Sequence, residues 1–150
     1  MAYLEWHRQT FELKRSDIDP SRSSERSVEP SAMSLHGLTR HLAAVERWWF
    51  RIQWVGEDVS MLYYSDDDPE QDFDDLSGDP REALAVWRAE CDGSRRIVAE
   101  APSLEATGTH AATGKPVSLR RVVVHMLAEY AQHNGHADLL REALDGRRGQ

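Results

Sequence analysis

The chain has 150 residues, a formal net charge of -8 at neutral pH and a single cysteine. This length predicts one domain, residues 1–150, whose core can close without disulfide or metal staples. The 26 acidic residues outnumber the 18 lysines and arginines, and no basic stripe offsets them, which excludes nucleic acid as a partner.

The N-terminal residues MAYLEWHRQTF are charged and amphipathic, and no apolar run reaches membrane length. The sequence therefore predicts neither a signal peptide nor a membrane span. The lone Cys91 cannot form an internal disulfide and fits a reducing compartment. We expect a cytoplasmic protein.

The first part of the chain predicts two helices. Residues 2–15 form the first, and a connector rich in serine, aspartate and proline follows over residues 16–30. Ser34 is a candidate N-cap for the second helix, which we expect to end near Gly56. Its apolar residues repeat at steps of three and four: Leu35, Leu38, Leu42, Val45, Trp49 and Ile52.

Residues 57–78 form a long connection without helical periodicity, and seven acidic residues fall between Asp66 and Asp75. We interpret this stretch as a solvated crossover loop. A calcium loop would need a central glycine among its acidic ligands, and SDDDPEQDFDDL has none.

Two more helices complete the pattern. Asp79 and Pro80 predict the start of a helix that runs to about Glu100, with Cys91 inside its apolar face as a packing residue rather than a nucleophile. The glycine-containing linker over residues 101–117 predicts a short two-stranded ribbon. Ser118 then caps a helix that runs to about Leu144 and stops at Gly146. These elements predict an all-α four-helix bundle with long crossover connections.

The last helix carries polar residues where a bundle requires apolar ones. Its seam consists of Leu119, Val123, Met126, Tyr130, His133, Ala137, Leu140 and Leu144. His125, Glu129 and His133 recur every four residues, so that neighbours lie about 6 Å apart along the helix and can converge on one ion. His136 lies on the same flank.

The alternative is a row of ordinary polar residues at the edge of the core. Burying Glu129 without a cation would cost several kcal/mol, which favours a metal site. On the second helix, His41 lies beside the seam, with Trp48 seven residues further along the same flank. Taken alone, a histidine in the position of His41 is usually a residue of the core edge.

Two stretches, SLHGLTRHLAAVERWWF and VHMLAEYAQHNGHADLLRE, together resemble the DinB/YfiT-like superfamily, and in particular its actinobacterial branch of mini-circle proteins. The resemblance extends over nearly the whole chain, including YYSDDDPEQDFDD and DPREALAVWRAE. It implies a four-helix bundle of up-down-down-up topology with one divalent metal near one end.

The resemblance places the metal ligands at His41, Glu129 and His133. Most of the superfamily has histidine at the middle position, and the glutamate here looks like the arrangement in mycothiol-dependent maleylpyruvate isomerase. Zinc and nickel are the metals we expect first. His125, His136 and Trp48 are expected to orient the ligands or to line a pocket, whereas His7 and His36 are expected at the surface.

The resemblance also implies a function. Its characterised members are metal-dependent transferases or isomerases that use low-molecular-weight thiols such as mycothiol or bacillithiol, so we expect a small-molecule substrate and a thiol cosubstrate. Arg47 or Arg51 could receive a substrate carboxylate, although basic residues at helical spacing more often form a solvated face. The alternatives are a non-catalytic metal-binding bundle and a purely structural bundle, and a homodimer is left open.

Overall fold

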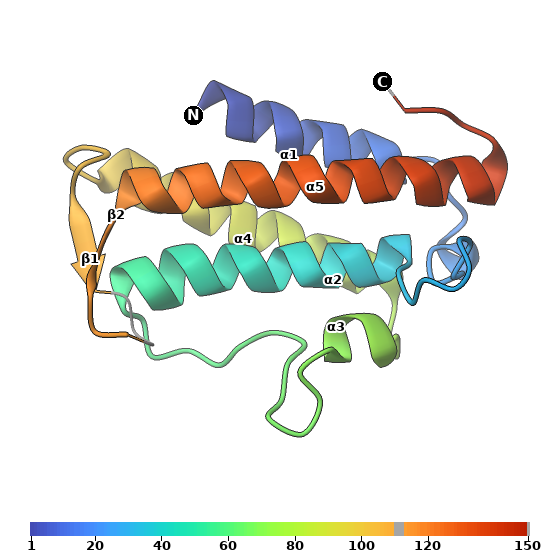
Figure 1. Ribbon diagram of the computed structural model, residues 1–150, viewed down its shortest axis with the longest axis horizontal. Helices are drawn as coiled ribbons and strands as arrows, with labels where there is room; N and C mark the ends of the chain where they lie inside the picture. The colour runs from blue at the N-terminus through green and yellow to red at the C-terminus, as the bar shows by residue number, and fades with distance from the viewer. Residues whose placement is uncertain (110–112, 150) are drawn as a thin grey trace.

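The computed structural model describes residues 1–109 and 113–149 of the chain. The long helices are α1 (Ala2–Arg15), α2 (Leu35–Glu46), α4 (Pro80–Glu100) and α5 (Leu119–Asp145), and the π-helix η2 (Arg47–Val55) continues α2 (Figure 1). The short elements are the 3-10 helix η1 (Pro20–Arg22), the single helical turn α3 (Gln71–Asp74), and strands β1 (Thr107–Thr109) and β2 (Pro116–Ser118).

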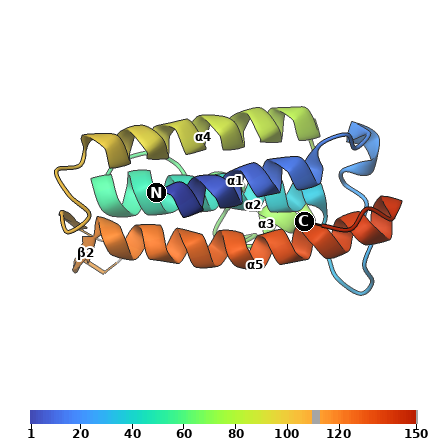
Figure 2. The same cartoon turned by 90° about the horizontal axis from the view of Figure 1, so that it is seen from above.

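The long helices pack side by side as a bundle (Figures 1 and 2). Helices α1 and α5 run in one direction and α2 and α4 run in the other, with α1 packed mainly against α5 and α2 mainly against α4. The two strands pair antiparallel immediately before α5, with Gly108 opposite Val117. The predicted all-α bundle with an up-down-down-up topology and a ribbon before the last helix is thus confirmed.

The helix ends lie where the sequence predicted them. The side chains of Ser34, Asp79 and Ser118 each accept a hydrogen bond from a backbone N–H in the first turn of the helix that follows. Gly56 and Gly146 adopt left-handed φ angles of 80° and 77°, which lets the chain leave η2 and α5 without a Cβ clash.

The buried face of the second helix departs from the predicted one in its last turns. The sequence pattern places Trp49 and Ile52 on the seam, but these residues are half-buried, whereas Phe50 and Gln53 are fully buried. The shift begins within α2, where Glu46 is buried and Val45 is half-buried, and it continues through the π-helical residues of η2.

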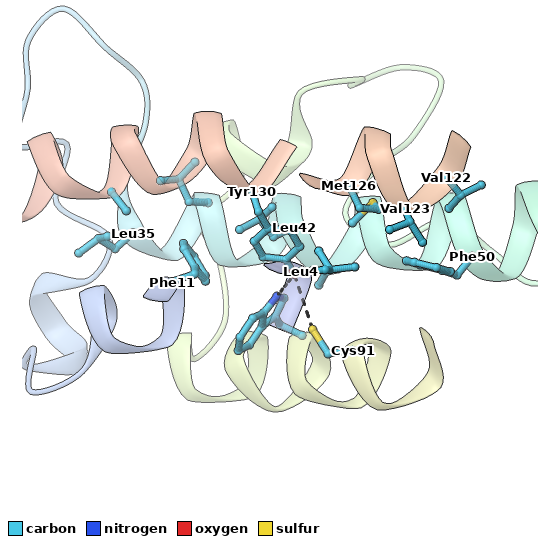
Figure 3. Close-up of a cluster of buried hydrophobic side chains, with 14 of the residues drawn as sticks. Leu4, Phe11, Leu35, Leu42, Phe50, Cys91, Val122, Val123, Met126 and Tyr130 are labelled. Atoms are coloured by element: carbon cyan, nitrogen blue, oxygen red, sulfur yellow. Dashed lines mark hydrogen bonds between the residues drawn. The ribbon is translucent and has the colours of Figure 1, made fainter. Parts of the chain in front are cut away.

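The core lies along the seam of α5. Seven of its eight predicted residues are buried and Leu144 is half-buried. Figure 3 shows Val122, Val123 and Met126 of this helix facing Phe50 and other apolar residues, with Tyr130 directed toward Cys91.

A buried polar network crosses the centre of this core. Glu46 is fully buried, and its carboxylate oxygens accept two hydrogen bonds from the guanidinium of Arg8, at 2.8 and 2.7 Å. The hydroxyls of Tyr130 and Ser94 also donate to Glu46, at 2.8 and 2.6 Å, and the indole of Trp87 donates to the Tyr130 oxygen at 2.9 Å. The network joins all four long helices, because its members come from α1, α2, α4 and α5.

The expectation of a surface His36 is wrong. Its side chain is only 1% exposed, because the connector between α1 and α2 folds over it, and Ser24 forms a hydrogen bond with its Nδ1 at 2.9 Å. His7 is half-buried, and the side-chain amide of Asn134 lies 3.3 Å from its Nδ1. Connector contacts of this kind leave no periodic signal in the sequence.

Burial, aided by Arg40 and Arg15, lowers the pKa of His36 to about 4 from an ordinary 6.5. At pH values between 4 and 6.5, His36 is therefore protonated in the unfolded chain but neutral in the folded chain. The stability contribution of neutral His36 is consequently lost as the pH falls from 6.5 toward 4. We expect wild type to lose about 2–3 kcal/mol more than His36→Asn over this window. Urea denaturation between about pH 7 and about pH 4 measures the difference; equal pH dependence of the two proteins would contradict a buried neutral His36.

Candidate metal centre

His41, Glu129 and His133 converge between α2 and α5. One nitrogen of each histidine and one carboxylate oxygen of Glu129 all lie within 4.8 Å of one another. The same oxygen, Glu129 Oε2, lies 3.8 Å from His41 Nε2 and 3.4 Å from His133 Nε2. The structure therefore brings together all three residues that the resemblance proposed as ligands.

Of the two ring nitrogens of His41, one forms a hydrogen bond and the other forms none with the residues that the structure describes. Its Nδ1 is 2.8 Å from Asp72 Oδ2, which orients the ring and lets Nδ1–H donate to the carboxylate. Its Nε2 is buried and has no hydrogen-bond partner among the residues that the structure describes. A buried nitrogen left without a partner beside a second imidazole and a carboxylate fits a divalent cation of the zinc or nickel type.

Asp72 is the residue of this site that the sequence did not reveal. It belongs to the acidic connection that we interpreted as a solvated loop, but its side chain is only 12% exposed and it lies on α3, against α2. Gly37 permits this approach, since a Cβ there would lie 2.9 Å from the ring of Phe73 and 3.3 Å from the carbonyl oxygen of Asp72. The glycine one helical turn before His41 is the only hint of this packing in the sequence.

The two other histidines of α5 contact the proposed ligands. His125 Nε2 is 3.2 Å from Glu129 Oε1, the oxygen that does not face His41. His136 Nδ1 is 3.3 Å from His133 Nδ1, so that one of these nitrogens donates and the other accepts. Each proposed ligand is thus contacted by a neighbouring side chain at an atom other than the one proposed to bind the metal. The neighbour is Asp72 for His41, His125 for Glu129 and His136 for His133.

The electrostatics of the cluster favour an ionised carboxylate. The imidazoles of His133 and His41, 3.4 and 3.8 Å from its carboxylate, hold the pKa of Glu129 well below its usual range, against the opposing effect of burial. Burial lowers the pKa of His41, but Asp72 and Glu129 outweigh it and raise this pKa to about 9. A cation that binds His41 must therefore displace a proton, and metal uptake should weaken as the pH falls.

A cavity of about 350 Å³ adjoins His41 and Asp72. Its other lining residues come from α2 and η2 and from the connection that follows: Ala44, Val45, Trp48, Met61, Leu62, Tyr63, Tyr64 and Pro69. Trp48 therefore lies in the wall of a cavity beside the cluster.

Cys91 and the two candidate carboxylate-binding arginines lie outside the cluster. Burial and the nearby Glu46 carboxylate raise the pKa of the Cys91 thiol far above its usual range, so it is not a thiolate near neutral pH. Arg47 and Arg51 both form ion pairs with Glu90, at 2.6 and 3.1 Å. Neither arginine is poised to receive a substrate carboxylate.

The bundle topology, the ribbon before the last helix and the meeting of the second and fourth long helices at this cluster agree with the DinB/YfiT-like superfamily, to which the family that matches the chain belongs. Within it, the chain belongs to the mycothiol-S-transferase family, whose model matches residues 1–146. No curated protein and no solved structure matches the chain. Among the described residues, no helix combines the length and the apolar character that crossing a membrane would require.

Proposed function

We propose that the thiol chemistry of the family takes place at this cluster, where His41, Glu129 and His133 hold one divalent cation, zinc or nickel first among them. The observation that carries the proposal is the buried, partnerless Nε2 of His41, 3.8 Å from the Glu129 carboxylate. Three protein ligands are typical of catalytic rather than structural metal sites, because they leave coordination positions open. We further infer that residues 1–150 form one domain, since one apolar core spans the four long helices. We also infer that the protein works in the reducing cytoplasm.

The proposed reaction is transfer of a small thiol such as mycothiol to an electrophilic carbon. A sulfur–carbon bond forms, the leaving group departs with its electron pair, and the thiol proton passes to solvent. A bound divalent cation supplies this chemistry by lowering the pKa of a thiol, so that the thiolate exists at neutral pH.

The surrounding residues of the chain orient the ligands. Asp72 fixes the His41 ring, and His136 fixes the ring of His133. His125 lies against the Glu129 oxygen that faces away from His41, which limits rotation of the carboxylate. A ligand held in this way loses little conformational freedom when it binds a cation.

The proposal is tested by incubating metal-free, zinc-loaded and nickel-loaded protein with mycothiol or bacillithiol and a model electrophile. We expect conjugate formation above the uncatalysed thiol reaction in a metal-loaded form and its loss with a chelator. If the rate does not exceed that of the uncatalysed reaction at any metal loading, the protein is not a thiol transferase. The alternative of a non-catalytic metal-binding bundle would then be retained. If turnover persists after the metal has been removed with a chelator, the proposed metal dependence of the reaction is wrong.

Replacing Cys91 by serine should leave thiol transfer within about twofold of wild type, because the nucleophile is the small thiol and Cys91 only packs in the core. Its Sγ lies 3.6 Å from both Glu46 Oε1 and the Tyr130 hydroxyl, where a serine hydroxyl can still form a hydrogen bond. The measurement is kcat and KM with thermal melts and metal content as controls. Abolished turnover in a folded, metal-loaded variant would make Cys91 catalytic.

A further inference from the structure

We propose that the cavity beside His41 binds the electrophile, and that this substrate is an uncharged molecule with an aromatic or similarly apolar body. The inference rests on the proposed function for the reaction itself, but the cavity and its binding preference are tested separately. It assigns the substrate class that the family match leaves open.

The lining of the cavity is apolar. Of its ten lining residues only His41 and Asp72 carry ionisable groups near neutral pH, and these two are bonded to each other at 2.8 Å. The remaining eight are aliphatic, aromatic, methionine or proline side chains. The volume of about 350 Å³ falls at the small end of the range for ligand pockets, which suits a molecule of one or two rings.

Three of the ten lining residues are tryptophan or tyrosine. Trp48 comes from η2, and Tyr63 and Tyr64 come from the connection that follows it. Planar rings of this kind contact a planar ligand by stacking or edge-to-face packing, which adds about 0.5–1.5 kcal/mol beyond the buried area. The lining therefore favours an aromatic ligand over a flexible polar one.

The charge around the cavity disfavours an anion. No lysine or arginine occurs among its lining residues. The guanidinium of Arg40 lies 4.3 Å from the centroid of the Tyr63 ring, and it donates hydrogen bonds to the carbonyl oxygens of Gln71 and Asp75. Asp68 and Glu70 flank the lining residue Pro69 in the chain, and His41, the one lining residue that can carry a positive charge, is already bonded to the Asp72 carboxylate at 2.8 Å, so a carboxylate ligand would find no unpaired cationic side chain in the lining.

The wall formed by the connection is held in a costly conformation. Tyr63 has a φ of 49°, a left-handed backbone that non-glycine residues seldom adopt. The contact of Arg40 with the Tyr63 ring fixes this turn from outside the cavity. Such a wall keeps its shape when the cavity is empty, which reduces the entropic cost of binding a ligand.

The position of the cavity suits group transfer. It shares His41 with the candidate metal centre, so a ligand in the cavity lies next to the place where the thiol would be activated. With a chlorinated nitroarene, for example, the thiolate sulfur would attack the ring carbon, the carbon–sulfur bond would form, and chloride would leave with the electron pair. Holding both reactants side by side converts a bimolecular encounter into a reaction within one complex.

Binding is tested first, without thiol and without turnover. Equilibrium dialysis of dinitrobenzene and of dinitrobenzoate against the purified protein compares a neutral with an anionic probe. We expect the neutral probe to bind at least about tenfold more tightly, a difference of about 1.4 kcal/mol. Equal affinity, or tighter binding of the anion, would overturn the proposal.

The location is tested with variants that fill the cavity. Ala44→Phe acts from α2 and Met61→Trp from the connection, so a folding defect in one does not remove the test. Ala89→Phe is the matched control, because Ala89 is an exposed residue of α4 that lines a different, polar cavity. We expect both filled variants to bind dinitrobenzene about tenfold more weakly than wild type while keeping the metal content of wild type. The affinity of the control variant for dinitrobenzene should not change. Undiminished binding in a folded filled variant would refute the location.

Turnover then separates this inference from the proposed function. With mycothiol and chlorodinitrobenzene, the filled variants should show a raised KM for the electrophile and an unchanged KM for the thiol. If wild type transfers thiol but filling the cavity leaves the electrophile KM unchanged, the substrate assignment fails and the proposed function stands. If the neutral probe binds as expected and no thiol transfer occurs with any metal, the proposed function fails instead.

Discussion

Replacing Glu46 by leucine will destabilise the fold by about 3 kcal/mol, because Nε and Nη2 of the buried Arg8 lose their acceptors and only Nη1 keeps one, Glu5 Oε1 at 2.6 Å. Arg8 is 1% exposed and Glu46 is fully buried, so water cannot take the place of the carboxylate. The hydroxyls of Tyr130 and Ser94 lose an acceptor at the same time. Urea denaturation at neutral pH measures the loss as a lower midpoint at constant slope.

The double variant Arg8→Met, Glu46→Leu is the informative control. It removes both charges and fills the space with apolar groups, so it should recover most of the stability that the single variant loses. A double variant as unstable as Glu46→Leu would mean that the ion pair is not the source of the effect. The exposed pair of Arg22 and Glu25, 44% and 46% exposed, provides a comparison in which Glu25→Leu should leave the denaturation midpoint nearly unchanged.

Replacing Glu129 by glutamine will abolish tight metal binding while the bundle stays folded. The amide occupies nearly the same space but lacks the negative charge that neutralises a dication and is a poorer ligand. The apolar seam of α5 on either side of it, with Met126 and Ala137 both 0% exposed, is unchanged. Wild type should therefore melt higher with metal than with chelator, by about 2.7 kcal/mol of stability at a metal concentration of about 100 times Kd, and Glu129→Gln should show no such shift.

Glu142→Gln is the matched control for this experiment, since Glu142 is an exposed carboxylate of the same helix that pairs with Arg148. It should keep the full metal-dependent shift. A wild type without any shift would contradict the metal site, and a Glu129→Gln variant with the wild-type shift would show that Glu129 is not a ligand.

Residues that signal through periodicity or capping chemistry were predictable. The seam of α5 alternates at steps of three and four, so its polar member His133 is an anomaly that the amino-acid pattern alone reveals. The serine and aspartate caps and the terminal glycines located the helix ends, because orphaned backbone groups need those residue types. The pairing of His41 with Glu129 came from the resemblance, since a contact between distant helices has no local signature.

Contacts that depend on the path of a connection were not predictable. Asp72 is one of seven acidic residues in its stretch, and only the packing of α3 against α2 distinguishes it from its exposed neighbours. The same holds for His36, covered by a connector without periodicity. Glu46 was hidden for a different reason: the apolar pattern favoured Val45 for the seam, whereas the structure buries its charged neighbour Glu46 and leaves Val45 half-buried.

The visible and near-ultraviolet spectrum of the cobalt-loaded protein during titration with mycothiol tests the central claim most directly. Cobalt(II) accepts the same nitrogen and oxygen ligands as zinc and reports them by colour. We predict a saturable sulfur-to-cobalt charge-transfer band in wild type, and neither cobalt uptake nor the band in His133→Ala. A cobalt spectrum that does not respond to the thiol, or a band that persists in His133→Ala, would contradict a thiol-activating metal centre at His41, Glu129 and His133.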